Sequence, residues 1–144
     1  MNVRAVFEHQ HIVTLDEIDG LGHVGNVEYI RWMQDAAIAH STANGWSMER
    51  YRESGFSWVA RSHFIEYRQP AYEKDEVTVH TWVANLKGIS SMRKYRMVRK
   101  SDDTVLAIAE TKWVFIDMKS KRPKRVPPEV AADYLIVGEE DEPK

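Results

Sequence analysis

The sequence predicts an α+β domain in which one antiparallel sheet packs against a single long helix. Three observations support this: an N-terminal segment of period two, one long segment of helical period, and then four long segments of period two. The turns between the last four are short, and short turns join antiparallel neighbours. A helix with one apolar side and a sheet with one apolar face can bury both surfaces against each other.

The first half of the chain contains a strand, a loop and the long helix. From about Val3 to Thr14 the residues alternate, with one face formed by Val3, Ala5, Phe7, His9, His11 and Val13. A glycine-rich loop follows, and its three glycines in six residues imply tight turns or a close approach by another group. The helix is predicted over about Asn26 to Ala43, where Gly45 provides a stop. Its apolar side is formed by Tyr29, Ile30, Met33, Ala36, Ala37 and His40.

The second half is predicted to be mostly strands. Ser47 can cap a short helix that continues to about Ser54, and Gly55 ends it. The four strands are predicted over Phe56–Arg68, Glu76–Leu86, Ile89–Lys100 and Thr104–Met118. Prolines then exclude further strands, and a last helical turn or two is expected over Glu129–Leu135.

Length and charge limit the function classes. The 144 residues fit one domain, 1–144, with a core over about 3–130 and an acidic, solvated tail over 138–144. A net charge of −2 argues against general nucleic-acid binding. No run reaches the roughly 18 apolar residues of a membrane span. The chain has no cysteine, which is compatible with the cytoplasmic location that we expect.

The loop before the long helix carries the most informative pattern, Asp19-x-x-Gly22-His23-Val24-x-Asn26-x-x-Tyr29. Backbone N–H groups at a helix start have no partner within the helix, so they can bind an anion or an oxyanion. A carboxylate beside them could attack a carbonyl or activate water. Spacing alone also allows a purely structural interpretation, in which Asp19 is a turn or cap residue.

The pattern resembles the signature of the 4-hydroxybenzoyl-CoA thioesterase family of hotdog proteins, Asp-x-x-Gly-His-Val-Asn-Asn-x-x-Tyr. The similarity runs in order over roughly residues 5 to 130. Its further matches are Glu66-Tyr67-Arg68-Gln69-Pro70-Ala71, Asp75-Glu76-Val77, Ser90-Ser91-x-Arg93-x-x-Tyr95, Trp113-Val114-Phe115-Ile116-Asp117, and Arg122-Pro123 before Val126-Pro127.

The resemblance implies a hotdog fold, with five or six antiparallel strands wrapped around the helix. It implies a homodimer or homotetramer with active sites at the subunit interface, acting on acyl-CoA or acyl carrier protein thioesters. Asp19 would be the nucleophile or general base, the backbone N–H of Asn26 would polarise the carbonyl, and His23 would assist. Further substrate or CoA contacts would be Gly25, Tyr29, Ser90, Ser91, Arg93, Lys94 and Arg122. Gly25 departs from the family, which often has Asn there, and this leaves the acyl group undefined.

Several alternatives are weighed beside this hypothesis. Asp35 lies four residues after Arg31, as in a surface ion pair, so we do not expect it to be catalytic. Gln34 shares a stripe with the apolar side of the helix and could reach the interior or a partner subunit. No metal is expected. Only His9 and His11 have the spacing of metal ligands, and no nearby cysteine or pair of carboxylates completes a ligand set. No cofactor is implied other than CoA as part of the substrate. A non-catalytic acyl-CoA-binding module or, with weaker support, a hotdog hydratase or dehydratase remains the alternative function.

Overall fold

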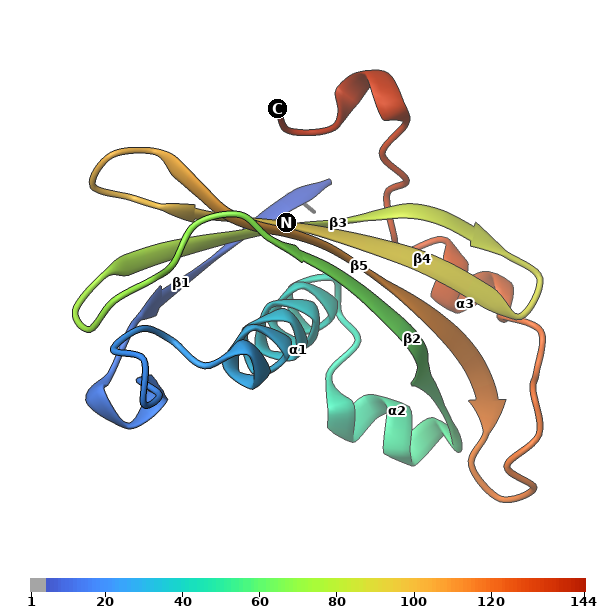
Figure 1. The fold of residues 1–144 in the computed structure, drawn as a ribbon. Coiled ribbons are helices and arrows are strands. Elements are labelled where there is room, and N and C mark those ends of the chain that lie inside the picture. Colours follow the sequence, from blue (N-terminus) through green and yellow to red (C-terminus); the bar gives the residue numbers. More distant parts are fainter. Residues whose placement is uncertain (1–4) are drawn as a thin grey trace.

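The computed structural model describes residues 5–144 and has a curved sheet that wraps around one helix (Figure 1). The strands are β1 (Val6–Ile12), β2 (Phe56–Tyr67), β3 (Glu76–Lys87), β4 (Ser90–Arg99) and β5 (Thr104–Asp117). The helices are η1 (Leu15–Glu17), α1 (Asn26–Ala43), α2 (Met48–Ser54), α3 (Pro128–Ala131) and η2 (Glu139–Asp141). The predicted antiparallel sheet with one long helix is therefore confirmed, and the sheet has five strands.

The strand order is β1-β3-β4-β5-β2, and every neighbouring pair is antiparallel. β2 follows the helices and pairs with β5 at one edge, whereas β1 pairs with β3 at the other. The side of β2 away from β5 pairs with no strand of the described chain. Short turns join β3, β4 and β5, as the sequence predicts.

The core lies between α1 and the concave face of the sheet. The predicted stripe of the helix is buried at Tyr29, Met33, Ala36, Ala37 and His40, and Ile30 is only half-buried. Trp32, which the stripe does not include, is 1% exposed because its ring packs beside Tyr29 and its indole N–H finds an acceptor in the preceding loop.

Two predictions for the C-terminal region need correction. The last helix is a single turn over Pro128–Ala131. Turn hydrogen bonds continue to Tyr134 without a second helical turn, and a parallel bridge then joins Ile136 to Val83. The acidic tail is exposed at Glu139–Asp141, but Glu142 is not solvated. It accepts a hydrogen bond from the indole of Trp82 at 2.9 Å and lies 3.0 Å from the Lys94 ammonium, so the tail docks on the outer face of the sheet (Figure 1).

Candidate active site

Asp19 lies in a small hairpin that precedes α1. An antiparallel bridge joins Ile18 to Val24, and inside it the Asp19 N–H donates to the carbonyl oxygen of His23 at 2.9 Å. Gly22 has φ +85, a left-handed conformation that glycine adopts without strain, and its N–H closes the turn onto the Asp19 carbonyl. The predicted tight turn is therefore present, with its carboxylate at the start of the turn.

The carboxylate of Asp19 is accessible. Its side chain is 38% exposed, and Oδ1 accepts the N–H of Leu21 at 2.8 Å. The second oxygen, Oδ2, accepts no hydrogen bond from residues 5–144. One oxygen is thus held by the turn while the other is open to a substrate or a water molecule.

Asp19 is adjacent to the start of α1. A Cβ built on Gly25, the N-cap of the helix, would lie 3.7 Å from the Cβ of Asp19. Gly25 has no side chain to cap the helix, and the N–H groups of Asn26 and Val27 have no acceptor within the described chain. A Cβ at position 25 would be in van der Waals contact with Asp19, which shows how close the carboxylate-bearing residue lies to the helix start.

Glu17 anchors the loop to the helix. Its carboxylate accepts the indole N–H of Trp32 at 2.7 Å, the N–H of Thr14 at 2.9 Å and a ring N–H of His11 at 2.8 Å. Burial opposes its ionisation, but these hydrogen bonds outweigh that effect and hold the pKa of Glu17 below its ordinary value. Its carbonyl also accepts the Gly25 N–H at 3.0 Å, so Glu17 fixes both sides of the hairpin.

The other predicted residues of this region have different surroundings. His23 is half-buried, its Nδ1 donates to the Val24 carbonyl at 3.2 Å, and the same atom lies 4.0 Å from Oδ1 of Asp19. Tyr29 is a core residue, 3% exposed, and burial raises its pKa to about 12. Tyr67 donates its hydroxyl to the Asn26 carbonyl at 3.0 Å and thereby ties β2 to the helix start.

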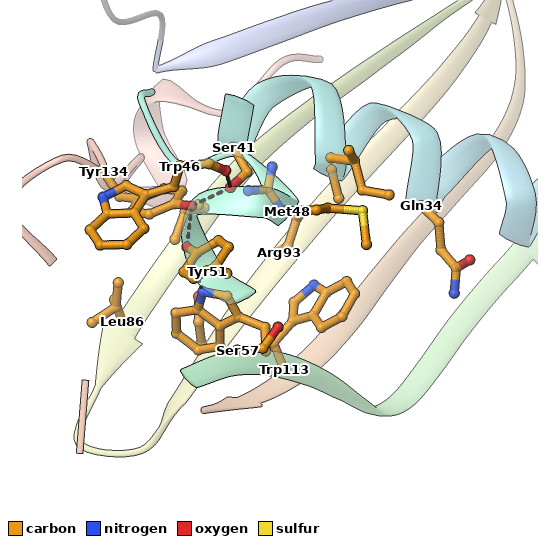
Figure 2. Close-up of a pocket in the computed structure, with 15 residues that line it drawn as sticks. Gln34, Ser41, Trp46, Met48, Tyr51, Ser57, Leu86, Arg93, Trp113 and Tyr134 are labelled. Carbon is orange, nitrogen blue, oxygen red and sulfur yellow. Dashed lines mark hydrogen bonds between the residues drawn. The ribbon is translucent and has the colours of Figure 1, made fainter. Parts of the chain in front are cut away.

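A cavity of about 270 Å³ lies between the C-terminal half of α1, α2 and the sheet (Figure 2). Its walls are mostly apolar and come from α1, α2 and strands β2 to β5, with Tyr134 from the segment after α3. Gln34 lies at one end, and Trp46 and Tyr134 lie at the other. Gln34 and Met48 are exposed to solvent, so the cavity opens on their side. Gln34 thus reaches this cavity, in keeping with its predicted stripe.

Polar groups line the inner part of this cavity. The hydroxyl of Tyr134 is 2.7 Å from that of Ser41 and 2.8 Å from that of Tyr51, which also accepts the indole N–H of Trp58 at 3.0 Å. Burial raises the pKa of Tyr51 far above its ordinary value, so the phenol stays protonated. The cavity therefore combines aromatic walls with a neutral hydrogen-bonding chain.

The predicted CoA contacts are spread over three surroundings. Arg93 is 5% exposed and lines the cavity, and Ser91 lines it too while donating to the Asn85 carbonyl at 2.7 Å. Lys94 points to the opposite face of the sheet, toward Glu142. Ser90 is half-buried at the start of β4, and Arg122 is exposed in a basic loop over 119–125. Ser90 lies near the Lys87 carbonyl, 3.4 Å from its hydroxyl, and Arg122 forms no ion pair within the described residues.

Asp35 is exposed on α1, but it does not form the ion pair that its spacing suggests. The guanidinium of Arg31 lies instead 3.6 Å from Glu28, one turn toward the helix start. Glu28 lies in the first turn of α1, where the helix dipole favours a carboxylate.

The sequence that forms this hairpin, helix and cavity matches a known protein family. Residues 13–133 match the model of the Thioesterase-like superfamily, and this stretch includes the hairpin, α1 and the whole cavity apart from Tyr134. The chain belongs to the Thioesterase-like superfamily. None of the helices within residues 5–144 of this superfamily member is long and apolar enough to cross a membrane.

Relatives of this superfamily chain carry thioesterase names. An oleoyl-acyl carrier protein thioesterase of Coriandrum sativum is 28% identical over 90% of the chain, which spans only 37% of that plant protein. The acyl-CoA thioester hydrolase YbgC of Shigella flexneri is 23% identical, with 85% of this chain and 90% of the relative covered. A 1,4-dihydroxy-2-naphthoyl-CoA thioesterase from Synechocystis superposes with a TM-score of 0.82 at 19% identity, covering 89% of this chain and 94% of that one. This likeness confirms the hotdog fold.

Sequence reasoning missed two parts of the site. Glu17 follows Thr14 by three residues, the spacing of a capping box, and that signal could have identified it as the anchor of the loop. The cavity gave no such signal, because Trp46, Tyr51 and Tyr134 come from segments that meet only in the folded chain.

Proposed function

We propose that the protein hydrolyses an acyl thioester carried by CoA or acyl carrier protein, with Asp19 as the catalytic carboxylate. The observation that carries this proposal is the position of the exposed Asp19 carboxylate beside Gly25, the N-cap of α1. Thioester hydrolysis is supported by the names of the protein's relatives, which are acyl carrier protein thioesterases and acyl-CoA thioester hydrolases.

In the proposed reaction, the thioester carbonyl oxygen is held by the free N–H of Asn26, which stabilises the negative charge that develops on it. Asp19 takes a proton from water while the hydroxide attacks the carbonyl carbon. The C–S bond then breaks, the acid forms, and the thiolate takes up the proton. In the alternative course, Asp19 itself attacks and forms a mixed anhydride that water hydrolyses. Neither course needs a metal or a cofactor.

His23 and Gly25 assist in this proposal. The ring of His23, 4.0 Å from the carboxylate, limits where Asp19 can point, and Gly25 leaves room for the thioester beside it. The exposed cations of the loop over 119–125, including Arg122, are candidates for phosphate groups of CoA, and Ser90 lies at the start of β4 near them.

A second copy of the chain completes the site in this proposal. β2 has an unpaired edge in the described chain and exposes Val59, Phe64 and Tyr67, although edge strands are normally short, charged or covered. Pairing of two β2 strands would form one continuous sheet and would bring a partner close to the helix start that Tyr67 contacts. We therefore propose a homodimer, or a tetramer built from two such dimers.

The test is Asp19→Asn beside Asp35→Asn, which removes an exposed carboxylate farther along α1. With a panel of aliphatic and aromatic acyl-CoA and acyl carrier protein thioesters, Asp19→Asn should lower kcat by at least about 10²-fold. Asp35→Asn should behave like the natural protein, and both variants should keep the same thermal midpoint. If Asp19→Asn hydrolyses thioesters with the kcat of the natural protein, Asp19 is not the catalytic carboxylate. A natural protein that binds CoA yet releases no thiol from any substrate would instead be a binding module.

A further inference from the structure

Arg93 is a buried cation in the wall of the cavity. It lies on β4, where Tyr95 and Met97 share its buried face, and its side chain is 5% exposed. Lys94 and Arg96, its neighbours on the strand, face the other side of the sheet and are only half-buried. The guanidinium therefore points toward α1 and the cavity rather than toward solvent.

The known partners of Arg93 are not anions. One guanidinium nitrogen, Nη1, donates to Nδ1 of His40 at 2.9 Å and to Oγ1 of Thr81 at 3.1 Å. Nε and Nη2 have no acceptor within residues 5–144, and no carboxylate of this part of the chain lies within salt-bridge distance. The other polar groups that act on Arg93 are the phenols of Tyr95, Tyr134 and Tyr51, and burial keeps the phenols of Tyr51 and Tyr95 neutral. Two of its nitrogens are thus left for a ligand in the cavity.

A guanidinium in this position needs an anion. Burial of a charge without a partner of opposite sign is strongly unfavourable, and arginine keeps its charge in proteins. Its planar N–H groups match the two oxygens of a carboxylate, which they can bind together. The neighbouring hydroxyls of Ser41 and Tyr134 add further polar contacts on the same inner side of the cavity.

The cavity is large enough, and its walls are apolar enough, to hold a carbon chain or a ring between its opening and Arg93. A cavity of about 150 Å³ suffices for benzene, so 270 Å³ holds a larger group. The indoles of Trp58 and Trp113 line it, and Gln34 lies at its end away from Trp46 and Tyr134, with Arg93 between the two ends in Figure 2. An acyl group that enters from the Gln34 side would direct its distal end inward.

We infer that the cavity binds an acyl group whose distal end carries a carboxylate, and that Arg93 is the residue that recognises this carboxylate. The inference rests on the proposed thioesterase function for the reaction, but the binding site follows from the cavity and its unpaired cation. The substrate class is therefore an ω-carboxyacyl thioester, or an aromatic acyl thioester with a ring carboxylate.

The first experiment measures hydrolysis of matched CoA thioesters of six, eight and ten carbons that end in a methyl, a hydroxyl or a carboxylate. The natural protein should show the highest kcat/KM with the carboxylate series at one chain length. Equal rates for carboxylate and hydroxyl ends, or a preference for methyl ends, would overturn the inference while leaving thioester hydrolysis intact. Failure of every thioester would instead refute the proposed function.

The second experiment uses Arg93→Met, which keeps a long side chain but removes the charge, with Arg96→Met on the opposite face of β4 as control. Arg93→Met should lower kcat/KM for the preferred ω-carboxyacyl substrate roughly 30-fold or more beyond its effect on the methyl-ended substrate. Arg96→Met should change neither. An equal loss for both substrates in Arg93→Met would mean that Arg93 only supports the fold.

A binding measurement separates the site from catalysis. In calorimetric titrations of the natural protein, octanoic acid should bind more tightly than uncharged octanamide, and Arg93→Met should abolish this difference. This readout does not depend on turnover, so it tests the site even if no thioester is hydrolysed. Equal affinity of the natural protein for octanoic acid and octanamide would overturn the inference.

Discussion

The carboxylate of Glu17 accepts the indole N–H of Trp32 at 2.7 Å and so joins the loop before α1 to the buried side of the helix. Asp19 lies two residues after this anchor, and Gly25, whose N–H donates to the Glu17 carbonyl, lies at the helix start. The same residue therefore helps to set the positions of the proposed catalytic carboxylate and of the helix start beside it. Glu17 is a positioning residue in this arrangement.

Glu17→Ala should destabilise the protein and displace the loop. It leaves the buried indole N–H of Trp32 without an acceptor, which costs about 1–3 kcal/mol. Urea unfolding measures this loss, and kcat should fall more than KM rises. Asp16→Ala, at an exposed neighbouring position in η1, is the control and should change the free energy of unfolding far less.

The contribution of Glu17 should depend on pH. Its pKa in the folded protein is lowered from 4.5, so its stabilising effect is fully present above that pH and is lost as the pH falls through the folded value. The difference in free energy of unfolding between the natural protein and Glu17→Gln should therefore shrink below about pH 4.5. A difference that stays constant from pH 7 to pH 3 would contradict the assignment of this shift.

Tyr67→Phe should weaken the connection between β2 and α1. The variant loses the 3.0 Å hydrogen bond to the Asn26 carbonyl, which contributes about 0.5–1.5 kcal/mol when well formed, and the exposed position favours the lower end. Denaturant unfolding compares it with Tyr72→Phe, an exposed tyrosine on the loop before β3. Identical stability of the two variants would show that the hydroxyl of Tyr67 does not stabilise the helix start.

Glu142→Gln should release the C-terminal segment from the sheet. It removes the ion pair with Lys94, for which we expect about 0.5–1 kcal/mol, because both side chains are less than one third exposed. The loss should become smaller as salt is raised, because salt screens the pair. The exposed Glu140→Gln is the control, and hydrogen exchange of residues after Ile136 gives a local measurement.

Phe64→Lys should favour the monomer. Phe64 is 60% exposed on the edge strand, and a charge there opposes pairing of two β2 strands. Sedimentation at micromolar concentration should show a dimer or tetramer for the natural protein and a smaller species for the variant. Leu135→Lys, also at an exposed apolar position but after α3, should leave the assembly unchanged. A natural protein that sediments as a monomer would refute the proposed assembly.

Much of the fold could be predicted because it depends on local patterns. The bounds of α1, Asn26–Ala43, agree with the prediction, since an apolar stripe and a glycine stop act over a few residues. Ser47 accepts the Arg50 N–H as a cap, and Gly55 ends α2 with φ +83, as predicted. The ends of β2 to β5 differ from the prediction by at most one residue, whereas β1 is shorter than predicted, and the predicted start at Val3 lies outside the described residues.

The site was less predictable where it depends on long-range packing. The motif predicted that Asp19 lies beside the helix start, because loop and helix are adjacent in sequence. Arg93 was predicted among the substrate or CoA contacts, but its burial in the wall of the cavity could not be predicted. β4 carries cations on both faces, so its charge pattern does not indicate which face packs on α1. Glu142 docks sixty residues away from Trp82, a contact that no local pattern predicts.

The docking of Glu142 on Trp82 and Lys94 determines where additions to the polypeptide would emerge. The last residues lie over the convex side of the sheet, whereas α1 and the loop before it lie on the other side (Figure 1). The cavity lined by Gln34 of α1 is also on that other side. A purification tag, a fluorescent label or a fused carrier attached after Lys144 would therefore start on the side away from the proposed chemistry, which suits surface immobilisation or imaging probes.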